Sequence, residues 1–168
     1  MHLKTDPVLS KLIEKFDVID YPKSTDYFES LVSSIIGQQL SNKAADTIYN
    51  RFKDLLPERK VAPEAVLNLS PEAIRKCGTS WAKASYLHDL ATKTLDGTLA
   101  LDKLETMADE DMIAHLTQVK GIGRWSAQMQ LMFAFHRPDI FPVDDMGIQN
   151  ALVKLFKLKK DSKSFKTK

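Results

Sequence analysis

The chain has 168 residues, a formal net charge of +2 and a single cysteine, Cys77. One cysteine excludes a disulfide framework and an iron–sulfur cluster held by cysteines alone. The chain has no secretory signal and no apolar run of about 18 residues, so we expect a soluble, intracellular protein of the cytoplasm and nucleoid, or of the nucleus in a eukaryote. The histidines are scattered without metal-ligand spacing, and no metal site is predicted from them.

The positive charge is concentrated at one end of the chain. Residues 154–168 contain seven lysines and one aspartate, which leaves about −4 for the other residues, where 21 acidic side chains outnumber 17 basic ones. A charged tail is usually only solvated, and the alternative is a tail that grips DNA. Because the body is not broadly basic, phosphate binding is expected to depend on backbone amides and a few side chains.

The chain is predicted to be all-α, with about nine or ten short helices, because β-branched alternation is absent over any useful length. Residues that favour the first turn of a helix mark the expected starts. These starts are Asp6-Pro7, Ser41, Ala62-Pro63, Ser70-Pro71, Ser80 and Asp109. The helix after Ser41 is expected to cover residues 42–55, and the helix after Ser80 to reach about Leu95.

Residues 111–135 predict two helices joined by a glycine turn, Gly121-Ile122-Gly123. The segment before the turn has apolar residues at 112, 113, 116 and 119, which is helical spacing. A nucleotide-cofactor loop needs a preceding strand and a third glycine, whereas position 126 is serine. The helix that begins after such a turn offers its amides and the positive end of its dipole to an anion. For these residues alone, an ordinary αα-corner is an equal alternative.

The helix after the turn, residues 124–135, is apolar on nearly every side and is predicted to be buried and central. One of its faces carries Trp125, Met129 and Phe133. Further on, the pair Asp144-Asp145 opens a last helix over residues 146–156. A glycine turn, an aromatic residue at a helix start and a carboxylate at another helix start indicate a site for a nucleic-acid base. The alternative is that both aspartates only cap the last helix.

Four segments match one family pattern in the same order along the chain. They are residues 6–13, 28–51, 77–91 and 116–145. The last segment resembles the helix-hairpin-helix and Gly/Pro…Asp loop of the HhH-GPD superfamily of DNA glycosylases, and the others resemble its N-terminal helix, its "I-I/L-G-Q-Q-x-S" helix pair and its "G-x-S-x-x-K-x-x-Y-L" helix. Within the superfamily the chain is most similar to the alkylpurine, 3-methyladenine II type branch. The resemblance covers about residues 5–156.

The resemblance implies an all-α, two-lobed helical fold with a cleft between the lobes. We expect one glycosylase unit over residues 1–168, with a central helical lobe at about 25–110. The hairpin and aspartate loop, about 111–156, are expected to pack with an N-terminal helix at 5–20, ahead of a lysine-rich tail at 157–168. Family members usually continue for one or two helices beyond the position of Leu158, so we expect either a short form or a chain that lacks its last helices.

The resemblance also implies a reaction, the removal of alkylated purines such as 3-methyladenine and 7-methylguanine from double-stranded DNA. The base is flipped out of the duplex, and Asp145 is the catalytic carboxylate that stabilises positive charge on the sugar. Asp144 is then its structural partner, capping the helix or orienting the loop. An alkylated purine already carries positive charge, so no strong general acid, cofactor or iron–sulfur cluster is required. The partner is DNA, with no membrane, and the protein is expected to be a monomer.

The substrate pocket is expected to be lined by Trp125, Met129, Gln38 and Trp81. Trp125 stands where the lyases of this superfamily carry a Schiff-base lysine, so the resemblance implies a monofunctional enzyme that leaves an abasic site. Its π face suits a cationic base. Tyr86 is a further candidate for the pocket wall, and core packing is the alternative for each of these aromatic residues.

The residues expected to contact DNA are Gln39, Leu40, Gly121, Ile122, Gly123, Arg124 and Ser126. Gln39 corresponds to the family's wedge, which fills the space left by the flipped nucleotide, and its polar side chain departs from an apolar wedge. A buried helix end is the alternative for this segment. The resemblance further implies a monovalent cation at the carbonyls of Gly121 and Gly123. A hairpin module that binds DNA or a partner protein without catalysis is the alternative function.

Overall fold

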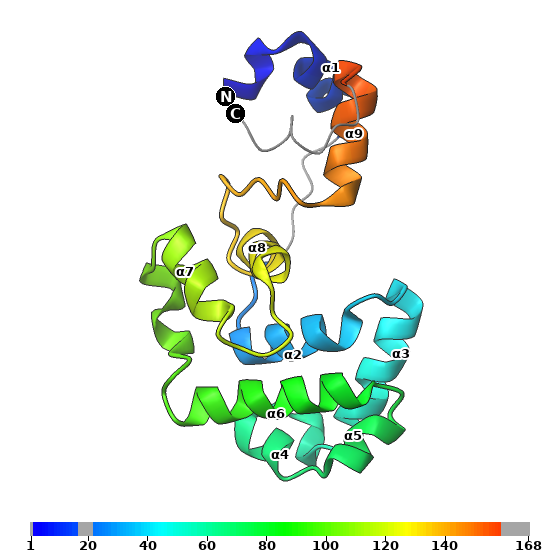
Figure 1. Cartoon of the computed structure of the whole chain (residues 1–168), viewed down its shortest axis with the longest axis vertical. Coiled ribbons are helices and arrows are strands. Elements are labelled where there is room, and N and C mark those ends of the chain that lie inside the picture. Colours follow the sequence, from blue (N-terminus) through cyan, green and yellow to red (C-terminus); the bar gives the residue numbers. More distant parts are fainter. Residues whose placement is uncertain (1, 17–21, 159–168) are drawn as a thin grey trace. The chain divides into compact units, whose positions relative to one another are not determined.

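The computed structural model describes residues 2–16 and 22–158, and within them every regular element is a helix (Figure 1). The elements are η1 (His2–Thr5), α1 (Pro7–Lys15), α2 (Tyr27–Gly37), α3 (Asn42–Lys53), η2 (Pro57–Arg59), α4 (Pro63–Leu67), α5 (Pro71–Lys76), α6 (Trp81–Leu95), η3 (Leu101–Thr106), α7 (Asp109–Leu116), α8 (Arg124–Phe133) and α9 (Met146–Phe156). The predicted all-α class is confirmed. None of these helices is long and apolar enough to cross a membrane. Most of the predicted lysine-rich tail, and residues 17–20 of the predicted N-terminal helix, lie outside the described residues.

Side-chain caps begin most helices where the sequence predicts them. The Asp6 carboxylate accepts hydrogen bonds from two amides of α1, and the hydroxyls of Ser70 and Ser80 accept one each from α5 and α6. The expected cap at Asp109 is wrong. Ala108 is the N-cap of α7, without a side-chain hydrogen bond, and Asp109 is the first residue of the helix. Its carboxylate instead lies 3.5 Å from the guanidinium of Arg137.

The chain forms two compact units, residues 1–22 with 141–168, and residues 23–140. In the described part of the first unit, neither α1 nor α9 contains a buried residue. The second unit holds α2 to α8. The hairpin helices α7 and α8 therefore belong with α2 and α6, whereas the sequence grouped them with the N-terminal helix. The lobe boundaries drawn from the sequence stay a prediction.

The long helix α6 organises the second unit. It packs against α2, α4 and α5, with α2 along one side and α4 and α5 along the other in Figure 1. Its inner face is fully buried at Leu87, Leu90 and Ala91. Burial of apolar side chains is the main term that stabilises such a helix, since a helix of this length is marginal in water by itself. The central turns of α6 are therefore anchored in the core.

Helix α8 packs only one of its faces against the core. Its buried residues are Ser126, Ala127, Gln128, Gln130 and Leu131. Trp125 is 45% exposed and Phe133 is 44% exposed, so the predicted burial of the helix holds for one face only. Buried Gln130 is compatible with this packing because its amide oxygen accepts a hydrogen bond from the Ser30 hydroxyl at 2.9 Å. The aromatic face of α8 is left open.

Candidate functional site

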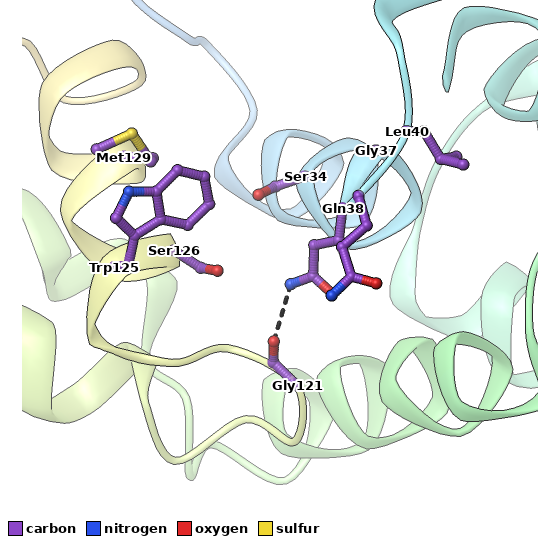
Figure 2. Close-up of a pocket in the computed structure, with 9 residues that line it drawn as sticks. Ser34, Gly37, Gln38, Leu40, Gly121, Trp125, Ser126 and Met129 are labelled. Atoms are coloured by element: carbon purple, nitrogen blue, oxygen red, sulfur yellow. Dashed lines mark hydrogen bonds between the residues drawn. The ribbon is translucent and has the colours of Figure 1, made fainter. Parts of the chain in front are cut away.

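A pocket of ≈ 570 Å³ lies in the second unit, where the end of α2 faces the start of α8 (Figure 2). It is lined by Ser34, Gly37, Gln38, Gln39, Leu40, Gly121, Trp125, Ser126 and Met129. Seven of the predicted site residues meet here, although they come from segments more than 80 positions apart. Trp81 does not. It is the first residue of α6, 57% exposed, and is not part of the pocket lining.

The pocket offers a flat apolar wall and neutral hydrogen-bonding groups. Figure 2 shows the Trp125 indole and the Met129 thioether on the α8 side, and Ser34 and Gln38 on the α2 side. None of the lining side chains is ionisable in the neutral range. Such a wall suits a planar heterocycle, because aromatic faces bind planar and cationic rings by stacking and by cation–π attraction.

The two glycines of the hairpin turn have different roles. Gly121 has a φ of +81°, and a Cβ atom placed on it would lie 2.1 Å from Cδ2 of Tyr86. Gly123 has an extended φ of −87°, and no neighbouring atom lies within 4 Å of a Cβ placed there. The fold therefore requires only the first glycine. Tyr86 supports the turn from α6 and packs against the core, which settles it as a packing residue and not a wall of the pocket.

The hairpin amides are only partly available to a phosphate. The Lys120 amide donates to the Asp89 carboxylate at 2.9 Å, and the Ile122 amide donates to the Val119 carbonyl at 3.1 Å. Ile122 itself is 5% exposed and belongs to the core. Burial opposes ionisation of Asp89, but hydrogen bonds from the Lys93 side chain and the Lys120 amide outweigh it and hold the pKa of Asp89 below its usual range. Gly123 is the N-cap of α8 and makes no side-chain cap.

The carbonyls that the resemblance assigns to a cation both accept hydrogen bonds within the chain. The Gly121 oxygen accepts from Nε2 of Gln38 at 2.8 Å (Figure 2), and the Gly123 oxygen accepts from the Ala127 amide at 2.9 Å. Each carbonyl keeps a second lone pair, so the expected cation stays a prediction. Over residues 2–16 and 22–158, no group of three or more His, Cys, Asp or Glu side chains could hold a metal.

The loop after α2 is a tight turn at the edge of the pocket. Its closing hydrogen bond runs from the Leu40 amide to the Gly37 carbonyl at 3.1 Å. Gln39 has a φ of +58° and is exposed, and Leu40 is 37% exposed. The alternative of a buried helix end is therefore wrong.

Sequence analysis missed the residue that holds this loop, Lys83. Its ammonium donates to the carbonyls of Ile36 and Gln38, each at 2.8 Å, and burial lowers the pKa of Lys83. The available signal was a lysine three residues after the helix-capping serine, in the "G-x-S-x-x-K" pattern.

Arg124, at the start of α8, forms a bidentate ion pair with Glu110 of α7. The two N–O distances are 2.8 and 2.6 Å, and both side chains are more than half exposed. The Arg124 pair holds the pKa of Glu110 below its usual range. Because exposed ion pairs are weak, Arg124 can exchange the Glu110 carboxylate for a phosphate with a small change in free energy.

Asp145 lies in the first unit and is the N-cap of α9. Its Oδ1 accepts the Ile148 amide at 2.8 Å, and its own amide donates to the Pro142 carbonyl at 2.9 Å. Asp144 is exposed. Of the two roles expected for Asp144, capping is wrong because Asp145 is the N-cap, and orienting the loop stays a prediction. The helix dipole at this position favours the ionised carboxylate.

Comparison with known proteins agrees with this fold. The family model for "HhH-GPD superfamily base excision DNA repair protein" matches residues 32–168. DNA-3-methyladenine glycosylase 1 of Schizosaccharomyces pombe is 34% identical over 90% of this chain and 68% of that protein. A putative DNA-3-methyladenine glycosylase of Bacillus subtilis, YfjP, is 36% identical over 84% of this chain and 50% of that protein.

Among solved structures, the S. pombe 3-methyladenine DNA glycosylase Mag1 in complex with abasic DNA superimposes with a TM-score of 0.82 and 33% sequence identity. The superposition covers 95% of this chain and 80% of that one. The chain thus spans about half to two thirds of the length of these two curated relatives. The matched residues, the helical fold and the hairpin lead to one conclusion. The chain belongs to the HhH-GPD superfamily of base excision DNA repair proteins.

Proposed function

We propose that this protein is a monofunctional DNA glycosylase that hydrolyses the N-glycosidic bond of alkylated purines in double-stranded DNA. The observation that carries the proposal is the pocket at the start of α8, where an exposed Trp125 ring stands beside neutral hydrogen-bonding groups. The names of the S. pombe and B. subtilis relatives support the same substrate class.

The pocket is proposed to hold the flipped base. A 3-methyladenine or 7-methylguanine base is planar and carries a positive charge, and the Trp125 face would attract it by ~0.5–2 kcal/mol. The hydroxyls of Ser34 and Ser126 line the pocket, together with Gln38, whose Nε2 donates to the Gly121 carbonyl and whose Oε1 would face the base. Because no carboxylate lines the pocket, the base would be recognised by shape and charge distribution, without an ion pair.

Asp145 is proposed to act on the sugar. Cleavage of the glycosidic bond places positive charge on the anomeric carbon, and a nearby carboxylate stabilises that charge and orients the attacking water. As the N-cap of α9, Asp145 is held by the Ile148 amide in a setting that favours its anion. A cationic purine leaves readily, so water is the only co-reactant and no cofactor is needed.

The start of α8 is proposed to bind a phosphate of the lesion strand. Gly123 places no side chain between the helix start and a ligand, and Arg124 adds a guanidinium. Phosphate contacts of this kind position the duplex and carry no sequence information. A protein that acts on chromosomal DNA in this way is expected in the nucleoid or nucleus, as a monomer.

The contacts of Lys83 and Lys120, two lysines beside the turns that border the pocket, support a monofunctional reaction. No lysine lines the pocket. Lys83 donates to two carbonyls, and Nζ of Lys120 lies 3.7 Å from the Asp89 carboxylate. Both amines are engaged in these contacts, whereas a Schiff base requires an amine that reaches the sugar.

A single-turnover assay on duplex DNA with one 7-methylguanine or 3-methyladenine tests the proposal. We expect release of the base and an intact abasic strand that breaks only after hot alkali, with no adduct trapped by borohydride. Strand breaks without alkali, or a trapped lysine adduct, would move the protein to the lyase branch. Binding to duplex DNA without any base release would instead support the non-catalytic hairpin module.

A further inference from the structure

One face of α6 contacts both turns that border the pocket. Lys83, Tyr86 and Asp89 are spaced three residues apart and therefore lie along the same side of the helix. Lys83 binds the loop after α2, while Tyr86 packs under Gly121 and Asp89 accepts the Lys120 amide. Two loops that are more than 80 residues apart in the sequence are thus fixed to a single rigid helix.

The loop after α2 has the geometry of a type II turn. Gln38 has φ −50° and ψ 130°, and Gln39 follows with φ +58°. A type II turn places its third residue in the left-handed region, where glycine is the usual occupant. Gln39 has a Cβ atom, so its conformation costs about 1–2 kcal/mol. An outlier of this kind persists only when its surroundings impose it.

The orientation of the Gln38–Gln39 peptide decides the turn type. In the common type I turn this peptide is rotated by roughly 180°, and the third residue has an ordinary negative φ. The direction of the Gln38 carbonyl therefore distinguishes the two turns. In the structure that carbonyl accepts a hydrogen bond from the Lys83 ammonium at 2.8 Å, which holds the type II orientation.

The hydrogen bonds of Lys83 all go to the end of α2 and the turn that follows it. Its second hydrogen bond goes to the Ile36 carbonyl, in the last turn of α2, where the helix dipole favours a cation. Among the ion pairs of residues 2–16 and 22–158, none involves Lys83. On the other side of the turn, the Gln38 side chain is tied to the Gly121 carbonyl.

We propose that Lys83 is a positioning residue, which holds the Gln38–Gln39 peptide in the type II orientation and thereby directs the Gln39 side chain at the DNA. The inference rests on the proposed function, since it assumes that Gln39 enters the duplex when a base is flipped. Lys83 touches neither the base nor the sugar in this account, and it acts through the backbone of the loop.

The turn type is measured first, in the free protein. In a type II turn the Gln39 amide hydrogen faces the Hα of Gln38, whereas in a type I turn it faces the Gln38 amide hydrogen. NMR nuclear Overhauser effects at these two pairs distinguish the turns without DNA. We expect wild type and Lys83→Arg to show the Hα–amide contact, and Lys83→Met to show the amide–amide contact. Lys76→Met, an exposed lysine of α5, is the matched control and is expected to resemble wild type.

The effect on catalysis is measured by a double-mutant cycle in the single-turnover assay. We expect Lys83→Met to slow base release by about tenfold, as does loss of the Gln39 side chain, with Lys83→Arg within threefold of wild type. In a Gln39→Gly background, Lys83→Met is expected to cause no further loss, because no side chain is left to direct. Lys83→Gln, which keeps a donor without the charge, replaces Lys83→Met if the latter does not fold.

The outcomes separate the two proposals. A wild-type protein that releases no base contradicts the proposed function, while the NMR measurement still tests the turn. An active wild type whose Lys83→Met variant keeps the Hα–amide contact overturns the role of Lys83. Losses that multiply in the double variant also overturn it, since they indicate a general structural effect of Lys83 that is independent of Gln39.

Discussion

The two turns at the pocket both contain a residue with positive φ, but for opposite reasons. In the hairpin turn the residue is Gly121, and the Tyr86 ring lies so close that a Cβ atom cannot be accommodated. In the turn after α2 the residue is Gln39, whose side chain is exposed. Packing explains the first choice completely. It does not explain the second, so the glutamine side chain is retained at an energetic cost that a function can account for.

The largest expected effect is on stability, at the hairpin turn. Gly121→Ala combines an unfavourable φ with a Cβ atom only 2.1 Å from Cδ2 of Tyr86, so we expect the free energy of unfolding to fall by about 2–5 kcal/mol. Gly123→Ala is the matched control and should change it by less than about 0.5 kcal/mol, because its φ is ordinary and its surroundings are open. Chemical denaturation of both variants provides the comparison, and equal losses would show that Tyr86 does not select the first glycine.

The other turn should respond in the opposite way. Gln39→Gly removes the left-handed strain, so we expect the free energy of unfolding to stay equal or to rise by up to about 1 kcal/mol. Base release should fall by about tenfold, since no side chain is left to fill the duplex. Denaturation and single-turnover kinetics on the same preparation measure both quantities. A Gln39→Gly variant that is less stable than wild type yet equally active would contradict both expectations.

A smaller effect is expected when the hairpin is altered without strain. In Gly123→Ala the added methyl group would stand at the N-terminus of α8, between the helix and a bound phosphate. We expect affinity for damaged and undamaged duplexes to fall by a similar, severalfold factor, because phosphate contacts carry no sequence information. Fluorescence anisotropy with both duplexes checks this. Weakening confined to one lesion would place Gly123 at the base instead of the backbone.

The smallest expected effect concerns the ion pair beside the same turn. Glu110→Gln removes the negative charge that pairs with Arg124, so affinity for every duplex should rise by about two- to fivefold at low salt. Stability should change by less than about 1 kcal/mol, as for other exposed pairs. A titration at two salt concentrations tests this, and an increase that persists at high salt would argue against an electrostatic origin.

The sequence predicts the helices well because their starts depend on local chemistry. Ser70 and Ser80 cap α5 and α6 through amides three residues away, and such signals lie within one turn. Asp109 misleads because Ala108 occupies the cap and Asp109 interacts with distant Arg137.

Other features depend on contacts that no local pattern encodes. The apolar sequence of α8 does not identify the face that packs inward, and only the fold shows that Trp125 and Phe133 lie on the open face. Trp81 and Trp125 are both predicted to line the pocket, and only the fold separates them, since Trp125 lines it and Trp81 does not. The partners of Lys83 are backbone carbonyls more than 40 residues away, which leave no trace in side-chain composition.

The Asp145 carboxylate is proposed to promote base release, and one substitution separates its charge from its role as a helix cap. Asparagine caps a helix about as well as aspartate, so Asp145→Asn should keep the hydrogen bond to the Ile148 amide and the stability of α9 while losing the charge. Asp144→Asn changes an exposed neighbour and is the matched control.

The decisive measurement is the single-turnover rate of 7-methylguanine release by these two variants, with DNA affinity and thermal stability recorded alongside. We predict that Asp145→Asn loses about 100-fold or more in rate, with affinity and stability near wild type, and that Asp144→Asn loses far less. Base release by Asp145→Asn at the wild-type rate, or an inactive Asp144→Asn, would contradict the assignment of the catalytic carboxylate.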